Sequence, residues 1–150
     1  MIMKIEWQDP LPMKRVRAMI YGVDLDQLPT EPGLYVFGRR WGDNFEALYV
    51  GKAMNVRSRI KAQLNSVKLM QHLRDATKGG RLVVPGILKN PGGKLVDKRL
   101  RLAERALIRY FLSEGHDLVN IHGTLLRRHE VESTSPPMSF VPKWIYLDSR

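Results

Sequence analysis

The 150-residue chain contains no cysteine. This absence excludes disulfide bonds, thiolate metal sites and cysteine nucleophiles. The chain also lacks an apolar run long enough to cross a bilayer, and its first ten residues hold no segment of signal-peptide length. We therefore expect a cytoplasmic protein without a membrane partner.

Acidic residues are scarce relative to basic ones. The chain has 15 Asp and Glu against 25 Lys and Arg, which gives a formal net charge of +10. A surplus of this size favours a polyanionic partner, because lysine and arginine bind phosphates and release counterions. Charge governs association and says nothing about chemistry, so it is equally compatible with a binding module and an enzyme.

Two short apolar segments each carry a tyrosine. Tyr35 follows Gly33 and Leu34, and Tyr49 precedes Val50 and Gly51. The two tyrosines are an even number of positions apart, with Gly42 at their midpoint. Residues opposite each other in an antiparallel pair share a face. A hairpin that turns around Gly42 would therefore bring both phenols together on one face.

A long helix is expected over residues 97–113. At about 100° per residue its apolar face holds Leu100, Ala103, Leu107, Ile108 and Phe111. Glu104 falls in the middle of that face. A carboxylate in an apolar stripe is costly unless it is paired, protonated or bound to a cation. An ion pair with an arginine such as Arg59 is one explanation and a metal ligand is another.

The remaining pattern predicts an α+β fold. We expect a small, mainly antiparallel three-stranded sheet from strands near residues 33–39, 47–52 and 81–88, with Pro85 marking the last as an edge or bulged strand. A helix follows at residues 56–64, with Asn55 as its N-cap candidate, and a further helical stretch runs to about Thr77. The first twenty residues are expected to be irregular or briefly helical.

These motifs resemble the GIY-YIG nuclease family. The resemblance rests on residues 28–37, on Tyr49-Val50-Gly51-Lys52-Ala53 and on Arg59, ten positions after the second tyrosine. Within the family it is nearest to the catalytic N-terminal domain of the bacterial excision-repair nuclease. Leu34 and Val50 stand where the family name has isoleucine. The resemblance implies the GIY-YIG fold and cleavage of phosphodiester bonds.

The resemblance also implies residue roles. Tyr35 is the favoured general base with help from Tyr49, and the alternatives are Tyr49 itself or a metal-bound hydroxide. Arg59 is expected as a phosphate clamp and Lys52 as a second cation of the site. Glu104 matches the helix-borne glutamate that ligates a divalent metal, which would be Mg²⁺ or Mn²⁺. One carboxylate with phosphate and water ligands suits Mg²⁺. No further clustered acids are present for a two-metal mechanism.

Further residues are weaker candidates for substrate binding. Gly51 would allow close approach of backbone or phosphate. Asn120 resembles a buttressing asparagine of the family but could equally end a turn, and His72 is as compatible with a plain surface helix. Basic side chains expected on the surface are Arg39 and Arg40 in the hairpin, Arg57 and Lys61 on the first helix, and Arg127 and Arg128. Trp41 either stacks on a base or folds over the hairpin.

The expected organisation is an N-terminal extension over residues 1–27, a nuclease domain over 28–122 and a C-terminal tail over 123–150 that packs on the domain. The leading hypothesis is a metal-dependent DNA endonuclease. The alternatives are an RNA-cleaving member of the same family and a non-catalytic nucleic-acid-binding module. Targeting would come from the basic surface, from the terminal segments, or from a protein partner or homo-oligomer.

Overall fold

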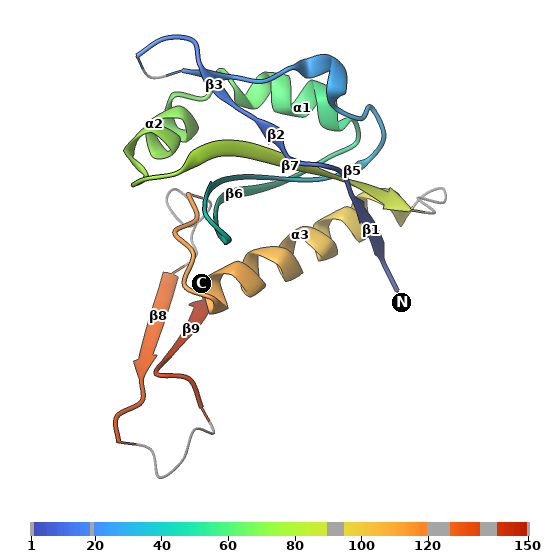
Figure 1. Ribbon diagram of the computed structural model, residues 1–150. Helices are drawn as coiled ribbons and strands as arrows, with labels where there is room; N and C mark the ends of the chain where they lie inside the picture. Colours follow the sequence, from blue (N-terminus) through green and yellow to red (C-terminus); the bar gives the residue numbers. More distant parts are fainter. Residues whose placement is uncertain (1, 19, 90–94, 120–126, 136–140, 150) are drawn as a thin grey trace.

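Five strands form one antiparallel sheet in the body of the molecule (Figure 1). The computed structural model describes residues 2–18, 20–89, 95–119, 127–135 and 141–149. The strand order is β1-β7-β5-β6, and β2 also pairs with β7. The strands are β1 Lys4–Trp7, β2 Leu11–Pro12, β5 Gly33–Trp41, β6 Asn44–Ala53 and β7 Gly80–Lys89. The α+β class is as expected, but the sheet is larger than the predicted three strands.

The additional strands come from the N-terminal segment, where the expectation of an irregular or helical start is wrong. Lys4–Trp7 alternates polar and apolar side chains, and it pairs with the C-terminal half of β7. Strand β2 pairs with the N-terminal half. A small separate hairpin of β3 Lys14–Arg15 and β4 Tyr21–Gly22 follows, and then a short 3-10 helix at Leu25–Gln27.

Strand β7 lies inside the sheet despite Pro85, so of the two alternatives, an edge or a bulged strand, the edge strand is wrong. Pro85 stands opposite Tyr35 of β5, and its carbonyl accepts a hydrogen bond from the Gln8 N–H at 2.9 Å. In an antiparallel strand, the backbone nitrogen and the carbonyl of one residue point toward the same neighbouring strand. The missing N–H of Pro85 therefore faces the interruption between Trp7 and Leu11, where the absent donor costs no ladder bond.

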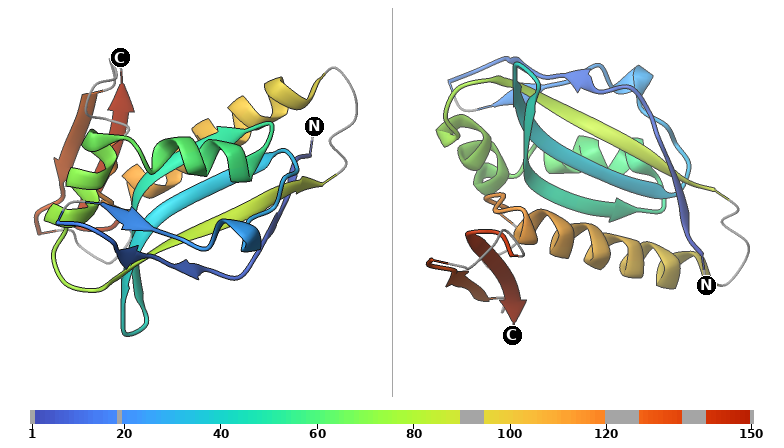
Figure 2. Two further views of the ribbon diagram at one scale, coloured as in Figure 1. Left: turned by 90° about the horizontal axis from the view of Figure 1, so that it is seen from above. Right: turned by 60° about the horizontal axis from the view of Figure 1, so that its bottom comes forward.

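Helices cover both faces of the sheet. In Figures 1 and 2, α1 (Val56–Gln63) and α2 (Val67–Asp75) lie on one face and α3 (Val96–Ser113) lies on the other. The Asn55 side chain caps α1 by accepting from the Ser58 N–H, as predicted. The apolar cluster on the α1–α2 face includes Tyr35 and Phe37. The α3 face buries the alternate residues Leu34 and Val36.

The β5–β6 hairpin has a different register from the one expected. Trp41 pairs with Asn44 across a two-residue turn, and continuing that register would place Tyr49 opposite Val36. Tyr49 would then point to the face away from Tyr35. Instead, Gly38 pairs with Ala47 and the preceding Phe37 pairs with Tyr49, so Leu48 is an extra residue in the ladder. This β-bulge places both tyrosines on the α1 side.

The C-terminal segment forms a second, two-stranded hairpin. Strand β8 (Arg127–Glu132) pairs antiparallel with β9 (Trp144–Ser149). Figures 1 and 2 show this hairpin beside the C-terminal end of α3, extending away from the main sheet. Strand β9 contacts α3. In the described part of the tail, β9 therefore packs on the long helix, and neither β8 nor β9 joins the main sheet.

Candidate functional site

A pocket of about 390 Å³ lies at the β6 edge of the main sheet. Strands β5 and β6 and the turn after them supply most of its wall, while α1 and α3 close it from opposite faces of the sheet. Its lining residues are Tyr35, Tyr49, Gly51, Lys52, Ala53, Met54, Arg59 and Glu104. All five residues predicted to be catalytic are among them, although they come from four elements.

The two phenols are held by one shared hydrogen-bond donor. The Tyr35 and Tyr49 rings stack with centroids 6.1 Å apart and an interplanar angle of 25°. The side-chain amide of Gln63 donates to the Tyr35 hydroxyl at 3.2 Å and to the Tyr49 hydroxyl at 3.1 Å. Both hydroxyl oxygens accept from Gln63, so the proton of each phenol can be directed to another acceptor.

The two phenols differ in their surroundings. Tyr35 has 0% of its surface exposed, whereas Tyr49 is half-buried. Burial raises the pKa of Tyr35 above its ordinary value, and the neighbouring Tyr49 raises it further. Hydrogen bonds from Gln63 and Arg59 and the charge of Arg59 oppose that rise. In the protein alone, Tyr35 is therefore the neutral phenol, and its anion requires additional positive charge.

Glu104 enters the pocket from α3, and it is half-buried there. Burial raises the pKa of Glu104, while the charge of Lys52, hydrogen bonding to the Lys52 backbone and the charge of Arg59 lower it. Strand β6 is the edge of the sheet, so its outward backbone groups are open to such a partner. Glu104 thus carries a carboxylate whose ionised form is favoured by any cation that enters the pocket.

Lys52 connects the pocket to the surface of α3. Its ammonium group lies 3.3 Å from Asp97 Oδ1, and the other oxygen of Asp97 lies 3.2 Å from Arg101 Nε. The chain Lys52–Asp97–Arg101 therefore runs from the pocket wall to the solvent side of the helix. Arg59 completes the basic lining from the exposed side of α1.

Gly51, expected to allow close approach of backbone or phosphate, makes room for the Tyr35 side chain. It pairs directly with Tyr35 across the β5–β6 ladder. A Cβ atom at Gly51 would lie 2.2 Å from the Tyr35 ring carbon that bears the hydroxyl and 2.3 Å from the hydroxyl oxygen. The phenol therefore occupies the space that a side chain would fill. Gly51 lines the pocket, but its first function is to seat Tyr35.

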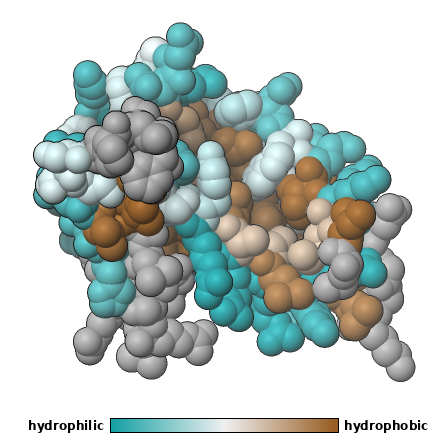
Figure 3. Space-filling model, turned by 90° about the horizontal axis from the view of Figure 1, so that it is seen from below, coloured by the Kyte–Doolittle hydropathy of each residue, from teal (hydrophilic) through white to brown (hydrophobic). Residues whose placement is uncertain are grey.

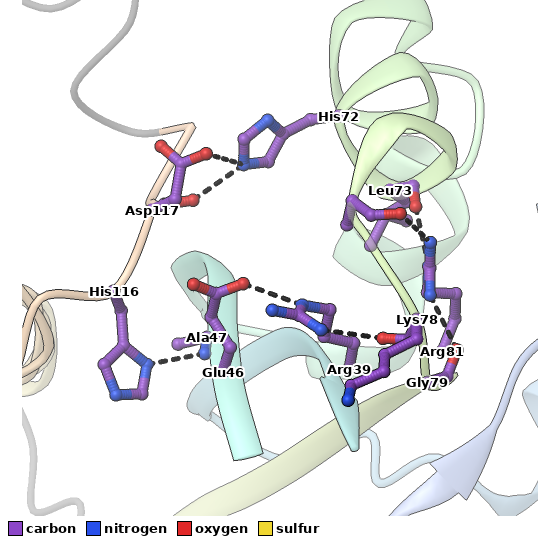
Figure 4. A network of polar contacts seen from close by, with 11 residues as sticks. Arg39, Glu46, Ala47, His72, Leu73, Lys78, Gly79, Arg81, His116 and Asp117 are labelled. Atoms are coloured by element: carbon purple, nitrogen blue, oxygen red, sulfur yellow. Dashed lines mark hydrogen bonds and ion pairs between the residues drawn. The ribbon is translucent and has the colours of Figure 1, made fainter. Parts of the chain in front are cut away.

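Several predicted surface residues are engaged inside the protein (Figure 4). Arg39 was expected in an exposed hairpin loop, but it is buried. It donates to Glu46 at 2.8 Å and to the Lys78 carbonyl at 2.7 Å, and its guanidinium lies 3.9 Å from the Trp41 ring centroid. Trp41 therefore folds over the hairpin, the second of the two alternatives. Arg40 is exposed and lies outside the pocket lining.

Two more candidates are placed away from the pocket. The Arg57 guanidinium donates to the Leu28 and Asp26 carbonyls and so ties α1 to the segment before β5. The His72 ring lies 2.7 Å from the Asp117 carbonyl (Figure 4). Neither lines the pocket. Asn120, predicted to buttress the site, lies outside the described residues.

Sequence reasoning missed Gln63 and Asp97. Gln63 follows Arg59 by four positions, so both lie on one face of α1, and this spacing was the available signal. Asp97 precedes Glu104 by seven positions, or about two helical turns, and faces the same side of α3. Neither residue belongs to a pattern that distinguishes it from ordinary helix-surface positions.

The residues at the pocket fit a single hard cation held by one carboxylate. Among the described residues there is no group of three or more His, Cys, Asp or Glu side chains that could hold an ion. Mg²⁺ can bind through one or two carboxylates with water and phosphate oxygens as its other ligands. Glu104, half-buried and beside the open edge of the sheet, is the residue suited to that role.

Comparisons with known proteins leave the family of this chain open. No protein-family model matches it, and no curated protein or solved structure is significantly similar to it. No helix in the described part of the chain is both long and apolar enough to cross a membrane.

Proposed function

We propose that this chain is a metal-dependent endonuclease that hydrolyses DNA phosphodiester bonds, a member of the GIY-YIG type. One observation carries the proposal. Residues that are far apart in the sequence and were singled out for phosphate chemistry, Tyr35, Tyr49, Lys52, Arg59 and Glu104, line a single open pocket. A positively charged wall, two phenols and one carboxylate can supply the charge stabilisation, proton transfer and metal binding that assist hydrolysis of a phosphodiester.

Each group has a task that its chemistry supports. Arg59 pairs with oxygens of the scissile phosphate and balances the charge that develops on them, since its planar guanidinium can bind phosphate in a fixed geometry. Lys52 adds a second positive charge on the other wall. When one phenol is ionised, its oxygen accepts the proton of the attacking water and becomes a neutral phenol, while the P–O bond breaks and the leaving oxygen takes a proton from solvent. The phenol then returns its proton to solvent, and Gln63 holds both phenol oxygens in place.

Proton acceptance by a phenol depends on positive charge. Burial disfavours the anion of Tyr35, and only Gln63 and Arg59 favour it in the protein alone. A phosphate-bound cation held by Glu104 would supply Lewis-acid charge at the phosphate and further favour a phenolate. Tyr49 is the more accessible phenol, so the water meets its hydroxyl first.

The experiment that tests the proposal is nicking of supercoiled plasmid DNA in Mg²⁺. Wild type is expected to nick, and Glu104→Gln and Tyr49→Phe are each expected to lower the rate at least about 100-fold, the usual scale for an acid–base or electrostatic group. The exposed residues Tyr110 and Glu114 provide matched controls. Tyr110→Phe and Glu114→Gln should nick like wild type.

The competing function is a nucleic-acid-binding module without catalysis, for which the net charge of +10 would be sufficient. Wild type and Glu104→Gln would then bind the plasmid equally and neither would nick it. Parallel assays on RNA, single-stranded DNA and branched DNA distinguish a DNA enzyme from an RNA enzyme. Equal nicking by wild type and Glu104→Gln would remove the role proposed for the carboxylate.

A further inference from the structure

The exposed side of α3 carries a row of basic residues that begins at the pocket. The helix holds two acids, Asp97 and Glu104, and several bases. Lys98, Arg101 and Arg105 follow one another at spacings of three and four positions, and all three are exposed. Residues with this spacing lie on one face of a helix. We call these three residues the α3 stripe.

The α3 stripe lies next to the catalytic side of the helix. At about 100° per residue, Arg101 is about 60° around the helix from Glu104, and Arg105 and Lys98 follow within about another 60°. Asp97 forms ion pairs with both Lys52 and Arg101 and so connects the pocket wall to the stripe. Asp97 is the acid between Lys52 and the stripe, but Lys52 and the three bases of the stripe outnumber it four to one, so the surface that continues from the pocket wall onto α3 stays positively charged.

The dimensions of the stripe suit a nucleic-acid backbone. Lys98 and Arg105 are seven positions apart, or about 10 Å along the helix. Stretched over two helical turns, three cations can contact successive phosphates of one strand, which recur about every 3.4 Å of duplex axis or more widely in a single strand. Figure 3 shows the molecule from the α3 side of Figure 1, where hydrophilic side chains lie on the surface beside an apolar area.

We propose that the α3 stripe binds the sugar-phosphate backbone of the nucleic acid next to the scissile phosphate and so guides the strand into the pocket. This inference rests on the proposed function for the direction of the strand, because the pocket is taken as the site of cleavage. Binding itself requires only the phosphates of the nucleic acid and the three basic side chains of the stripe. The stripe contacts phosphates and no base edges, so it contributes affinity and orientation without sequence preference.

The test measures binding separately from cleavage. All proteins carry Glu104→Gln and are assayed in EDTA by fluorescence anisotropy with labelled single-stranded DNA, duplex DNA and single-stranded RNA of one sequence. The triple variant Lys98→Gln, Arg101→Gln, Arg105→Gln is compared with a charge-matched control, Lys14→Gln, Arg15→Gln, Arg17→Gln. The control residues are exposed and lie in or beside β3, which Figure 1 places on the opposite side of the sheet from α3.

The stripe variant is expected to bind roughly 100-fold more weakly at 0.1 M salt, with the slope of log K against log salt reduced by about 2 to 3, because each phosphate contact contributes about 0.7 to 0.9 to that slope. The control should keep the slope of the parent. Equal slopes for the stripe variant and the parent would overturn the inference. The three nucleic acids show whether the stripe prefers duplex or single strands.

A second measurement locates the strand. Because the chain has no cysteine, Lys98→Cys and Lys14→Cys each introduce one unique thiol for a photo-crosslinker. Crosslinking to the oligonucleotide is expected at residue 98 and not at residue 14, and equal yields would count against the stripe.

The two proposals can fail separately. If the stripe variant loses binding but wild type does not nick DNA, the role of the stripe stands and the enzyme proposal fails. If wild type nicks DNA but the stripe variant binds as tightly as its parent, the enzyme proposal stands and the role of the stripe fails.

Discussion

Glu104 illustrates how one residue can serve a site at a cost to the fold. Burial raises its pKa, so ionisation is less favourable in the folded chain than in the unfolded one. For a carboxyl group with a raised folded pKa, the folded state is most favoured when the group is protonated and loses stability as pH rises through the shifted pKa. Lys52 and Arg59 offset only part of this cost, so at neutral pH the ionised carboxylate destabilises the fold unless a cation compensates.

The first prediction follows from the Lys52 charge. Since this charge lowers the pKa of Glu104, Lys52→Gln should raise that pKa and move the acidic limb of the cleavage rate to higher pH. Rates measured from pH 4 to 8 in Mg²⁺ check the shift. Lys89→Gln, which removes an exposed lysine paired with Glu6, is the control and should leave the acidic limb unchanged. An acidic limb shared by Lys52→Gln and wild type would show that the Lys52 charge does not reach Glu104.

The β5–β6 hairpin is the element that builds the site. Its ladder places Tyr35 over Gly51 and, after the bulge at Leu48, Tyr49 opposite Phe37. The three aromatic rings then contact each other, with Phe37 edge-on to Tyr35 at 5.7 Å and in a T-shaped contact with Tyr49 at 6.2 Å. Position and packing of the phenols are therefore properties of strand pairing.

The second prediction tests that pairing at Gly51. Gly51→Ala would place a methyl group inside the Tyr35 ring, so we expect a loss of about 1 to 3 kcal/mol in the free energy of unfolding, the usual cost of overpacking, and reduced cleavage. Denaturant titration and the nicking assay measure both. Gly80→Ala is the matched control, because a Cβ there meets nothing within 4 Å. Equal stability of the two variants would contradict the close fit of Tyr35 on Gly51.

On the scale of the whole molecule, the two ends of the chain have different roles. The N-terminal strands β1 and β2 cover the outer side of β7, and Leu11 of β2 and Met13, which follows β2, belong to the buried cluster. In the described part of the chain, the members of the three apolar clusters end at Val119. The β8–β9 hairpin lies beyond that core and contacts α3.

The third prediction compares two truncations. Removal of residues 2–12 exposes β7 as an unpaired edge and deletes Leu11 from the core, so the thermal unfolding midpoint should fall by several degrees or folding should be lost. A chain ending at residue 126 keeps every described core residue and should unfold cooperatively near the wild-type midpoint. Scanning calorimetry of both chains checks the order, and a lower midpoint for the C-terminal truncation would reverse this view.

The sequence alone determined the helix of α3 with Glu104 on its inward side, the Asn55 cap, and two tyrosine strands joined by a turn near Gly42. These features depend on periodicity and on local turn and cap chemistry, which neighbouring residues specify. Resemblance to a known family also singled out five residues that line the pocket, but its weaker candidates Arg39, Arg40, Arg57 and His72 do not line it.

Tertiary structure alone decided the rest. The register depends on a bulge at Leu48, which no local pattern marks and which nevertheless sets the face of Tyr49. The burial of Arg39, the bonds of Arg57 to Leu28 and the place of β1 beside β7 depend on partners distant in the chain. Gln63 and Asp97 gained their contacts in the same way. Local signals fix elements, but pairing between elements fixes which side chains meet, because packing energy is shared by residues that the sequence separates.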